Sequence, residues 1–270
     1  MIGFGNPLLD GNPRERPWES QWAALARDKA CNGLPLQWVT EATHKTRGVL
    51  RVARRDGHAD LADVRSLMPL PDTADELCGV AKDLKLSPDD IWLGARATET
   101  NIKALSDQGK LAQYHVLHLA THGTLAGDIS GSSEPGLIFT PPKEATGLDD
   151  GYLSASEVAA LKLDADWVIL SACNTAAGGA QGAEALSGLA RAFIYAGARA
   201  LLVSHWSVDS AATVKLVTSA VGATARDKTI GRTEALRRAM LAMIDTGEAR
   251  EVHPAYWAPF VVVGEGTAAK

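Results

Sequence analysis

The stretch Asp166–Cys173, which reads DWVILSAC, places an apolar run directly before a cysteine. An apolar run without polar alternation is typical of a strand that is covered on both faces of a parallel sheet. A second run, AQYHVLHLAT at 112–121, predicts another such strand and is followed by His122 and Gly123. Reactive groups gather at the carboxyl ends of strands in open parallel sheets. If the two strands are neighbours, an imidazole and a thiol therefore meet over one sheet edge.

The rest of the chain from residue 71 onward alternates between helix and strand patterns. Ser154 and Glu157 have the spacing of a capping box, and Asp72 or Thr73 is expected to begin an earlier helix. Helices are predicted at DTADELCGVAKDL, TETNIKALSDQG, YLSASEVAAL, GAEALSGLARAFIYAG, AATVKLVTSAVG and TEALRRAMLAMIDTG, and further strands at DIWLGA, ARALLVSHW and WAPFVVVG, with a hairpin-like piece at PGLIFTPP. This alternation predicts an α/β sandwich with a mostly parallel sheet and right-handed crossovers.

The composition of the 270-residue chain excludes several classes of protein. The formal net charge of -5 gives no general attraction to nucleic acid or to an anionic membrane, so neither is expected as a partner. No apolar run is long enough to cross a bilayer, and the first residues do not resemble a secretory signal, which leaves the cytoplasm as the expected location. Three cysteines without a CxxC pair, Cys31, Cys78 and Cys173, argue against a disulfide framework and a zinc knuckle.

A thiol and an imidazole at one sheet edge can perform nucleophilic catalysis. A free thiol has a pKa of about 8.5 and becomes strongly nucleophilic only as the thiolate. His122 is the candidate base that takes the proton of Cys173 and later protonates a leaving amine. Gly123 has no side chain, so its backbone N–H can approach an oxyanion closely, and the N–H of Cys173 is a candidate second donor.

Other interpretations of these residues remain open from spacing alone. A cysteine at a strand end is often a buried small apolar residue, and His-Gly often marks a turn. His118 and His122 form an H-x-x-x-H pair, but zinc sites of that type lie on helices with an intervening glutamate, so we expect no metal and place His118 beneath the site. The glycine-rich turn Gly178–Gly182 resembles a phosphate-binding loop, although it lacks a lysine and the known glycine signatures. No cofactor is expected.

Six segments of the chain carry a family resemblance: GFGNP, LGARATETNIKAL, HLATHG, DGYLSASEVAALKLDADWVILSACNTAAGG, GLARAFIYAGARALLVSHWSVDS and HPAYWAPFVVVG. Together they resemble the CHAT domain family, a caspase-like family related to caspases and separases. The resemblance implies a three-layer α/β/α fold of the caspase-hemoglobinase type and a cysteine endopeptidase of bacterial origin. It also implies that His122 and Cys173 form the catalytic dyad, the pair that the strand ends had already indicated.

The resemblance to caspases and separases also indicates where a substrate binds. In those relatives, the segment after the strand that follows the catalytic cysteine lines a groove for an extended peptide. The matching segment is VSHWSVDS, so Ser204, Trp206 and Asp209 are candidate groove residues. The uncharged Ser171 and Ser210 give no indication of a preference for basic residues at the cleavage site.

The family resemblance also suggests a domain organisation and a second possible function. Residues 1–265 are expected to form one CHAT domain, with 10–64 as an irregular polar excursion and 266–270 as a tail. An upstream part of the domain and tetratricopeptide (TPR) repeats are expected outside this chain, and the TPR region or a partner protein could regulate it. The alternative to a peptidase that cleaves a protein or peptide is a caspase-like interaction module whose dyad is idle or inhibited.

Overall fold

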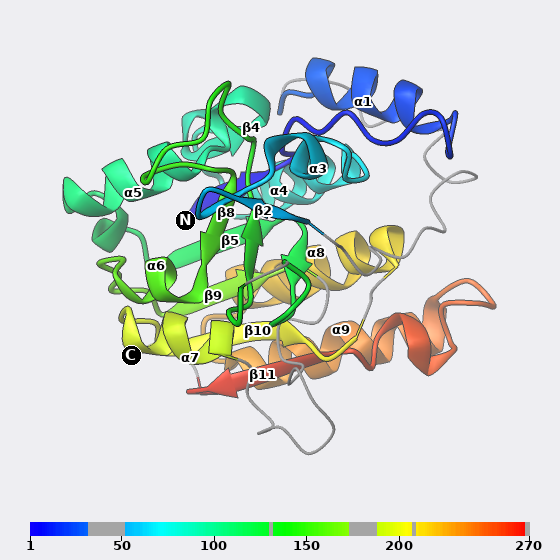
Figure 1. Cartoon of the computed structure of the whole chain (residues 1–270). Helices are drawn as coiled ribbons and strands as arrows, with labels where there is room; N and C mark the ends of the chain where they lie inside the picture. Colours follow the sequence, from blue (N-terminus) through cyan, green and yellow to red (C-terminus); the bar gives the residue numbers. More distant parts are fainter. Residues whose placement is uncertain (32–51, 130–131, 173–187, 207–208, 268–270) are drawn as a thin grey trace.

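A six-stranded sheet forms the centre of the protein in the computed structural model, which describes residues 1–31, 52–129, 132–172, 188–206 and 209–267 (Figure 1). The strand order is β11-β10-β9-β5-β1-β4. The strands are β1 (Ile2–Gly5), β4 (Ile91–Leu93), β5 (Val116–Ala120), β9 (Trp167–Leu170), β10 (Ala200–Ser204) and β11 (Phe260–Gly264). Pairings among the first five in the chain are parallel, and β11 joins β10 antiparallel. The expected α/β class and the mostly parallel sheet are confirmed.

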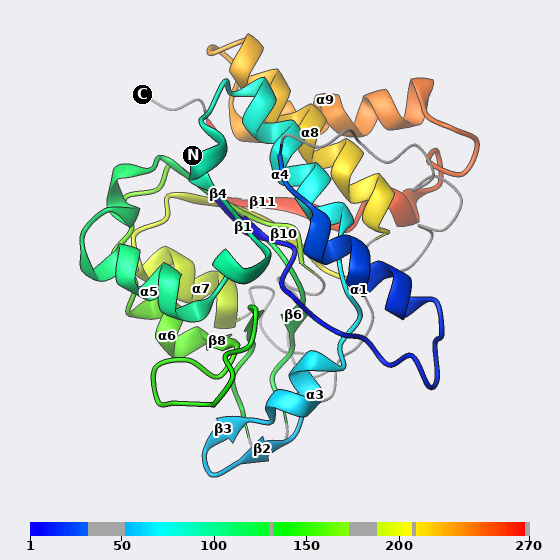
Figure 2. The same ribbon diagram turned by 90° about the horizontal axis from the view of Figure 1, so that it is seen from above.

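Helices cover both faces of this sheet, which gives three layers (Figure 2). One face carries α4 (Asp72–Asp83), α8 (Ser210–Arg226) and α9 (Arg232–Thr246), which pack on β9, β10 and β11. The other face carries α5 (Glu99–Asp107), α6 (Ala155–Ala159) and α7 (Gly188–Tyr195). The longest of these helices, α8, has 17 residues, and no helix in the described ranges is long and apolar enough to cross a membrane.

The central strands form because their residues are apolar on both sides of the chain. All four residues of β9 and all five of β10 are buried, as continuous apolar runs predict. The capping box before α6 is present, because Ser154 accepts from the Glu157 N–H and Glu157 bonds back to the Ser154 N–H. Helix α4 begins at Asp72, as expected, but its N-cap is Pro71 and no side chain caps it. The Thr73 hydroxyl instead donates to Leu70 O at 2.7 Å and accepts from Asn6 N at 2.8 Å.

A smaller sheet and several short elements stand beside the main sheet. The smaller sheet is antiparallel, in the order β6-β7-β8. Its strands are β6 (Gly123–Thr124), β7 (Gly136–Ile138) and β8 (Tyr152–Ser154), and the polar region 10–64 contributes α1 (Glu19–Asp28), β2 (Arg54–Arg55), β3 (His58–Ala59) and α3 (Leu61–Arg65). Single turns of 3-10 helix occur at η1 (Pro88–Asp90), η2 (Gly94–Arg96), η3 (Leu111–Gln113) and η4 (Pro254–Tyr256). The expected domain limits stay a prediction.

Two of the three cysteines form a disulfide, contrary to the sequence-based expectation. Cys31 and Cys78 are joined with a Cα–Cα distance of 5.1 Å across a sequence separation of 47. Cys31 follows α1 and Cys78 lies within α4, so the bond ties the polar region to the main helical layer. Sparse cysteines without a repeated spacing do not reveal such a pairing, because tertiary packing alone brings them together. Disulfides are uncommon in reducing compartments, so cytoplasmic location stays a prediction.

Candidate functional site

The two strands that were expected to meet at the site are direct neighbours. His118 of β5 lies opposite Ile169 of β9, and Leu119 lies opposite Leu170. One residue further on, the Ser171 N–H donates to Leu119 O at 3.0 Å. The ends of β5 and β9, which His122 and Ala172 follow closely in the chain, therefore lie at the same edge of the sheet. Cys173 itself and the glycine-rich turn that follows it lie outside the described residues.

The imidazole of His122 is oriented by a backbone carbonyl. His122 is 1% exposed, and its Nε2 lies 2.7 Å from the carbonyl oxygen of Met68, in the connection between α3 and α4. A carbonyl can only accept a hydrogen bond, so Nε2 must carry the proton. In the neutral ring, Nδ1 is then the basic nitrogen. This fixed tautomer is what a general base at this sheet edge requires.

The backbone N–H of Gly123 points away from the ladder between β6 and β7. The Ile138 N–H donates to His122 O at 3.0 Å, and Gly123 lies opposite Leu137. In an antiparallel pair this pattern makes Gly123 and Leu137 a non-hydrogen-bonded pair, whose N–H and C=O groups point outward. The Gly123 N–H is therefore directed away from β7 and takes no part in the ladder between β6 and β7.

The three predicted groove residues have different environments. Ser204 is fully buried at the end of β10, and its hydroxyl donates to the Ala172 carbonyl at 2.6 Å. Asp209 caps α8, because its carboxylate accepts from the Ala212 N–H at 2.9 Å. Trp206 is 44% exposed, which is unusual for an indole in a folded domain. Of the three, only the Trp206 side chain presents a large surface to solvent.

A buried polar cluster lies beneath this edge of the sheet. His118 Nε2 lies 2.7 Å from Glu76 Oε1 and 2.9 Å from Ser171 Oγ, and the Ser171 hydroxyl also donates to Glu76 Oε1. All three side chains are fully buried. His118 was expected to pack or hydrogen-bond beneath the site. Glu76 was missed, although a carboxylate on the apolar stripe of α4, beside Leu77 and Val80, was a signal.

This cluster contains the residue types of a serine hydrolase triad, but it cannot act as one. In a working triad the serine and the carboxylate bind different nitrogens of the imidazole. Here both Ser171 and Glu76 approach Nε2 of His118, and full burial keeps substrates from the hydroxyl. The cluster must act through structure or electrostatics.

The histidine pair that invited a zinc interpretation has separate partners. His118 contacts Glu76 and Ser171, whereas His122 contacts the Met68 carbonyl. Among the described residues, no group of three or more histidine, cysteine, aspartate or glutamate side chains is arranged to hold a metal ion.

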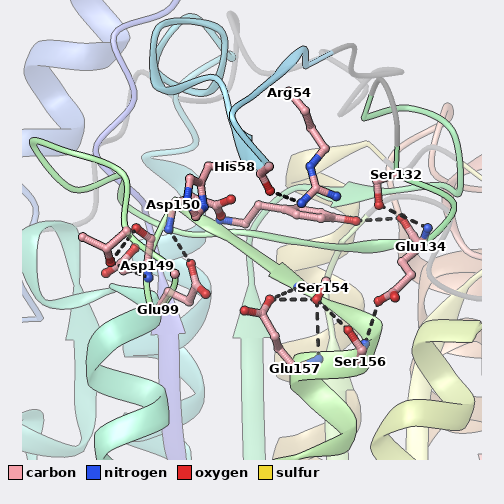
Figure 3. A pocket seen from close by; sticks show the side chains of 14 residues that line it. Arg54, His58, Glu99, Ser132, Glu134, Asp149, Asp150, Ser154, Ser156 and Glu157 are labelled. Carbon is pink, nitrogen blue, oxygen red and sulfur yellow. Dashed lines mark hydrogen bonds between the residues drawn. The ribbon is translucent and has the colours of Figure 1, made fainter.

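A polar cavity of about 290 Å³ opens beside the small sheet (Figure 3). Carboxylates dominate its lining: Glu99, Glu134, Asp149, Asp150 and Glu157. Several serve internal bonds, since Asp150 accepts from the N–H groups of Ala59 and Tyr152, and Glu134 accepts from the Ser156 N–H. Among the described residues predicted for the site, none lines this cavity.

Comparison with known proteins identifies the family. A family model described as the CHAT domain matches residues 23–265, which is most of the chain. No curated protein matches the sequence. The match implies a caspase-like, peptidase-related domain, and the mostly parallel sheet covered by helices on both faces is consistent with that fold.

Proposed function

Because the chain belongs to the CHAT domain family, we propose that it is a cysteine endopeptidase with His122 and Cys173 as its dyad. One observation carries the proposal: β5 and β9 are neighbours, and the Met68 carbonyl fixes the tautomer of the imidazole at the end of β5. With its proton directed to the Met68 carbonyl, the neutral ring keeps Nδ1 as the nitrogen that can accept the thiol proton. The residue that follows Ser171 and Ala172 is a cysteine, whose thiolate is the strongest nucleophile among ordinary side chains at neutral pH.

The proposed reaction passes through an acyl-enzyme. The Cys173 thiol gives its proton to His122 Nδ1, and the thiolate attacks the carbonyl carbon of the scissile peptide bond. The oxyanion accepts hydrogen bonds from the N–H groups of Gly123 and Cys173. The imidazolium then protonates the leaving amine, which departs as the new N-terminus. Water, deprotonated by His122, attacks the thioester and releases the acid product with the thiol restored.

The substrate is proposed to bind as an extended peptide past the end of β10. The exposed indole of Trp206 supplies an apolar wall, and Asp209 lies three residues further along the chain, at the start of α8. Ser204 contributes in another way, because its hydroxyl aligns the Ala172 carbonyl from within the core. A protein or peptide is therefore the proposed partner, with a TPR region or a second protein as the proposed regulator.

A thiol-directed peptide probe tests this function. Peptidyl acyloxymethyl ketones with varied residues before the warhead should label the wild-type protein and give a thioether at Cys173. Cys173→Ala should abolish labelling, and His122→Ala should slow it by at least about a hundredfold, since a general base of this kind contributes roughly 10²–10⁴. If no probe of the set labels the wild-type protein, the proposed peptidase function is refuted.

The burial of His122 favours a second candidate, a caspase-like interaction module with an idle or inhibited dyad. A nearly inaccessible imidazole can reach a substrate only after a local rearrangement. The same probes distinguish the two functions, because an idle dyad reacts no faster in wild type than in His122→Ala.

A further inference from the structure

The end of β9 is held from both sides immediately before Cys173. On the β5 side, Ser171 is bound through its N–H to Leu119 O and through its hydroxyl to Glu76. On the β10 side, the Ala172 carbonyl accepts from Ser204 Oγ at 2.6 Å. Ser171 and Ala172 are thus held by bonds from β5, α4 and β10. Both lie just beyond the end of β9, where the chain could otherwise fray.

Glu76 and His118 form one hydrogen-bonded unit with Ser171. Glu76 Oε1 can accept two hydrogen bonds, one from the Ser171 hydroxyl and one from His118 Nε2. A proton on His118 Nδ1 would be a buried donor without an acceptor in the described part of the chain. A proton on Nε2 fits these contacts, because it directs the imidazole and the Ser171 hydroxyl to the same carboxylate oxygen.

Fold stability alone does not explain a carboxylate at this place. Replacing a buried ionic or strongly polar cluster by apolar residues of similar volume is often neutral or stabilising. Glu76 lies on the apolar stripe of α4 next to Leu77 and Val80, where a leucine would pack in the surrounding core. The carboxylate instead orients Ser171, because its hydrogen bonds fix where the Ser171 side chain and peptide unit lie.

We infer that Glu76 and His118 are positioning residues for the proposed nucleophile: by holding Ser171, they set the course on which the chain leaves β9 toward Cys173. This inference rests on the proposed function. Glu76 and His118 are assigned no contact with substrate. They act through Ser171, while Ser204 acts on Ala172 from the opposite side.

The test compares Glu76→Leu with Glu76→Gln. Leucine removes the bonds but fills the core, whereas glutamine keeps an amide oxygen that can accept from Ser171 and His118. For Glu76→Leu we expect kcat on a peptide substrate to fall at least about tenfold with KM changed less than about threefold. Glu76→Gln should recover much of that loss. Glu19→Leu, the same exchange at another fully buried carboxylate in α1, is the control and should leave kcat unchanged.

Alkylation gives a second readout that does not depend on proteolysis. With the Cys31–Cys78 disulfide intact, Cys173 is the one free thiol of the three cysteines, so iodoacetamide reports on it alone. Ser171→Ala leaves Glu76 and His118 in place and removes only the hydroxyl that links them to the end of the strand. We expect the pH midpoint of alkylation to rise in this variant toward about 8.5, the value of an unassisted thiol. Because this prediction concerns Ser171→Ala, it can be tested even if Glu76→Leu fails to fold.

The outcomes separate this inference from the proposed function. A wild-type kcat in Glu76→Leu, an equal loss of kcat in Glu19→Leu, or an unchanged alkylation profile in Ser171→Ala would overturn the positioning role. If wild type cleaves no peptide and labels with no probe, the proposed function fails, while a shifted alkylation profile in Ser171→Ala would still support the positioning role.

Discussion

Glu99 is a buried carboxylate whose ionisation the fold opposes. It is 1% exposed at the start of α5, contacts Lys103, and accepts from the N–H groups of Asp150 at 3.1 Å and Gly151 at 3.2 Å. Burial outweighs these contacts and raises its pKa from 4.5 to about 8. Lys103 also bonds Glu157 at 2.8 Å. One cation thus serves two carboxylates, and the more deeply buried of them holds a proton at neutral pH.

This raised pKa predicts a pH-dependent stability. The folded state binds the Glu99 proton more tightly than the unfolded chain, so its contribution to stability is complete below about pH 4.5 and is lost as pH rises to about 8. Glu99→Gln keeps acceptors for the backbone N–H groups and has no such loss. Relative to that variant, wild type should lose roughly 3 kcal/mol of unfolding free energy between pH 5 and pH 8 in urea titrations. The exposed Glu144→Gln is the control and should give a flat difference.

The residues of the site differ in how far they could be predicted from sequence. His122 and Gly123 could be predicted from the sequence, because their place at a strand end and their residue types both indicate a catalytic role. Met68 was not, since its carbonyl serves as the partner and its side chain carries no signal. Glu76 had a signal, an acidic residue on an apolar helical stripe, but its partners come from β5 and β9 and needed the tertiary structure. The position of Cys173 stays a prediction.

At the scale of single elements, the end of α7 depends on a glycine. Gly197 has φ of 113°, and a Cβ there would lie 2.3 Å from the carbonyl oxygen of Leu163. The same connection is joined by a hydrogen bond from Leu163 N to Ala196 O at 2.9 Å. The chain passes from α7 to β10 through this tight contact. Both the positive φ and the lack of room for a Cβ therefore require glycine at position 197.

Two glycine-to-alanine exchanges distinguish the cost of a positive φ from the cost of a steric clash. Gly109, after α5, has φ of 67°, and within the described ranges no atom beyond its chain neighbours lies within 4 Å of the place that an added methyl group would occupy. Gly109→Ala should therefore cost only about 1–2 kcal/mol of unfolding free energy. Gly197→Ala adds a clash with backbone and should cost at least about 2 kcal/mol more. Chemical denaturation of both variants checks this order. Equal losses would show that the connection yields to the added methyl group.

Elements were predicted well where periodicity and burial agree. The strands β5, β9 and β10 and the helices α4, α5, α8 and α9 follow apolar patterns that leave little choice of structure. Prediction was poorer for the small sheet and for 10–64, because strands of two or three residues such as β2 and β6 have no periodicity to recognise. Their pairing is set by contacts between distant segments.

At the scale of the whole molecule, the disulfide links regions that the sequence keeps apart. Cys31 and Cys78 close a loop with a sequence separation of 47. A crosslink of this span limits the unfolded chain and is typically worth about 2–4 kcal/mol. It also leaves Cys173 as the remaining cysteine, so thiol counting without reductant reports on the proposed nucleophile.

Thiol counting provides the check. Protein denatured without reductant should react with one equivalent of a thiol reagent, at Cys173, and with three equivalents after reduction. Cys31→Ser should lower the unfolding free energy by about 2–4 kcal/mol and expose a second thiol, Cys78. Three reactive thiols in the unreduced wild-type protein would contradict the disulfide.

The proposal that the chain cuts polypeptides is tested most directly by identifying the N-termini it creates. Wild type, Cys173→Ala and His122→Ala are each incubated with a mixture of folded and unfolded proteins, and newly formed N-termini are identified by mass spectrometry. The proposal predicts a set of new termini with wild type that is lost in Cys173→Ala and strongly reduced in His122→Ala. The same termini in all three samples, or none in any of them, would contradict it.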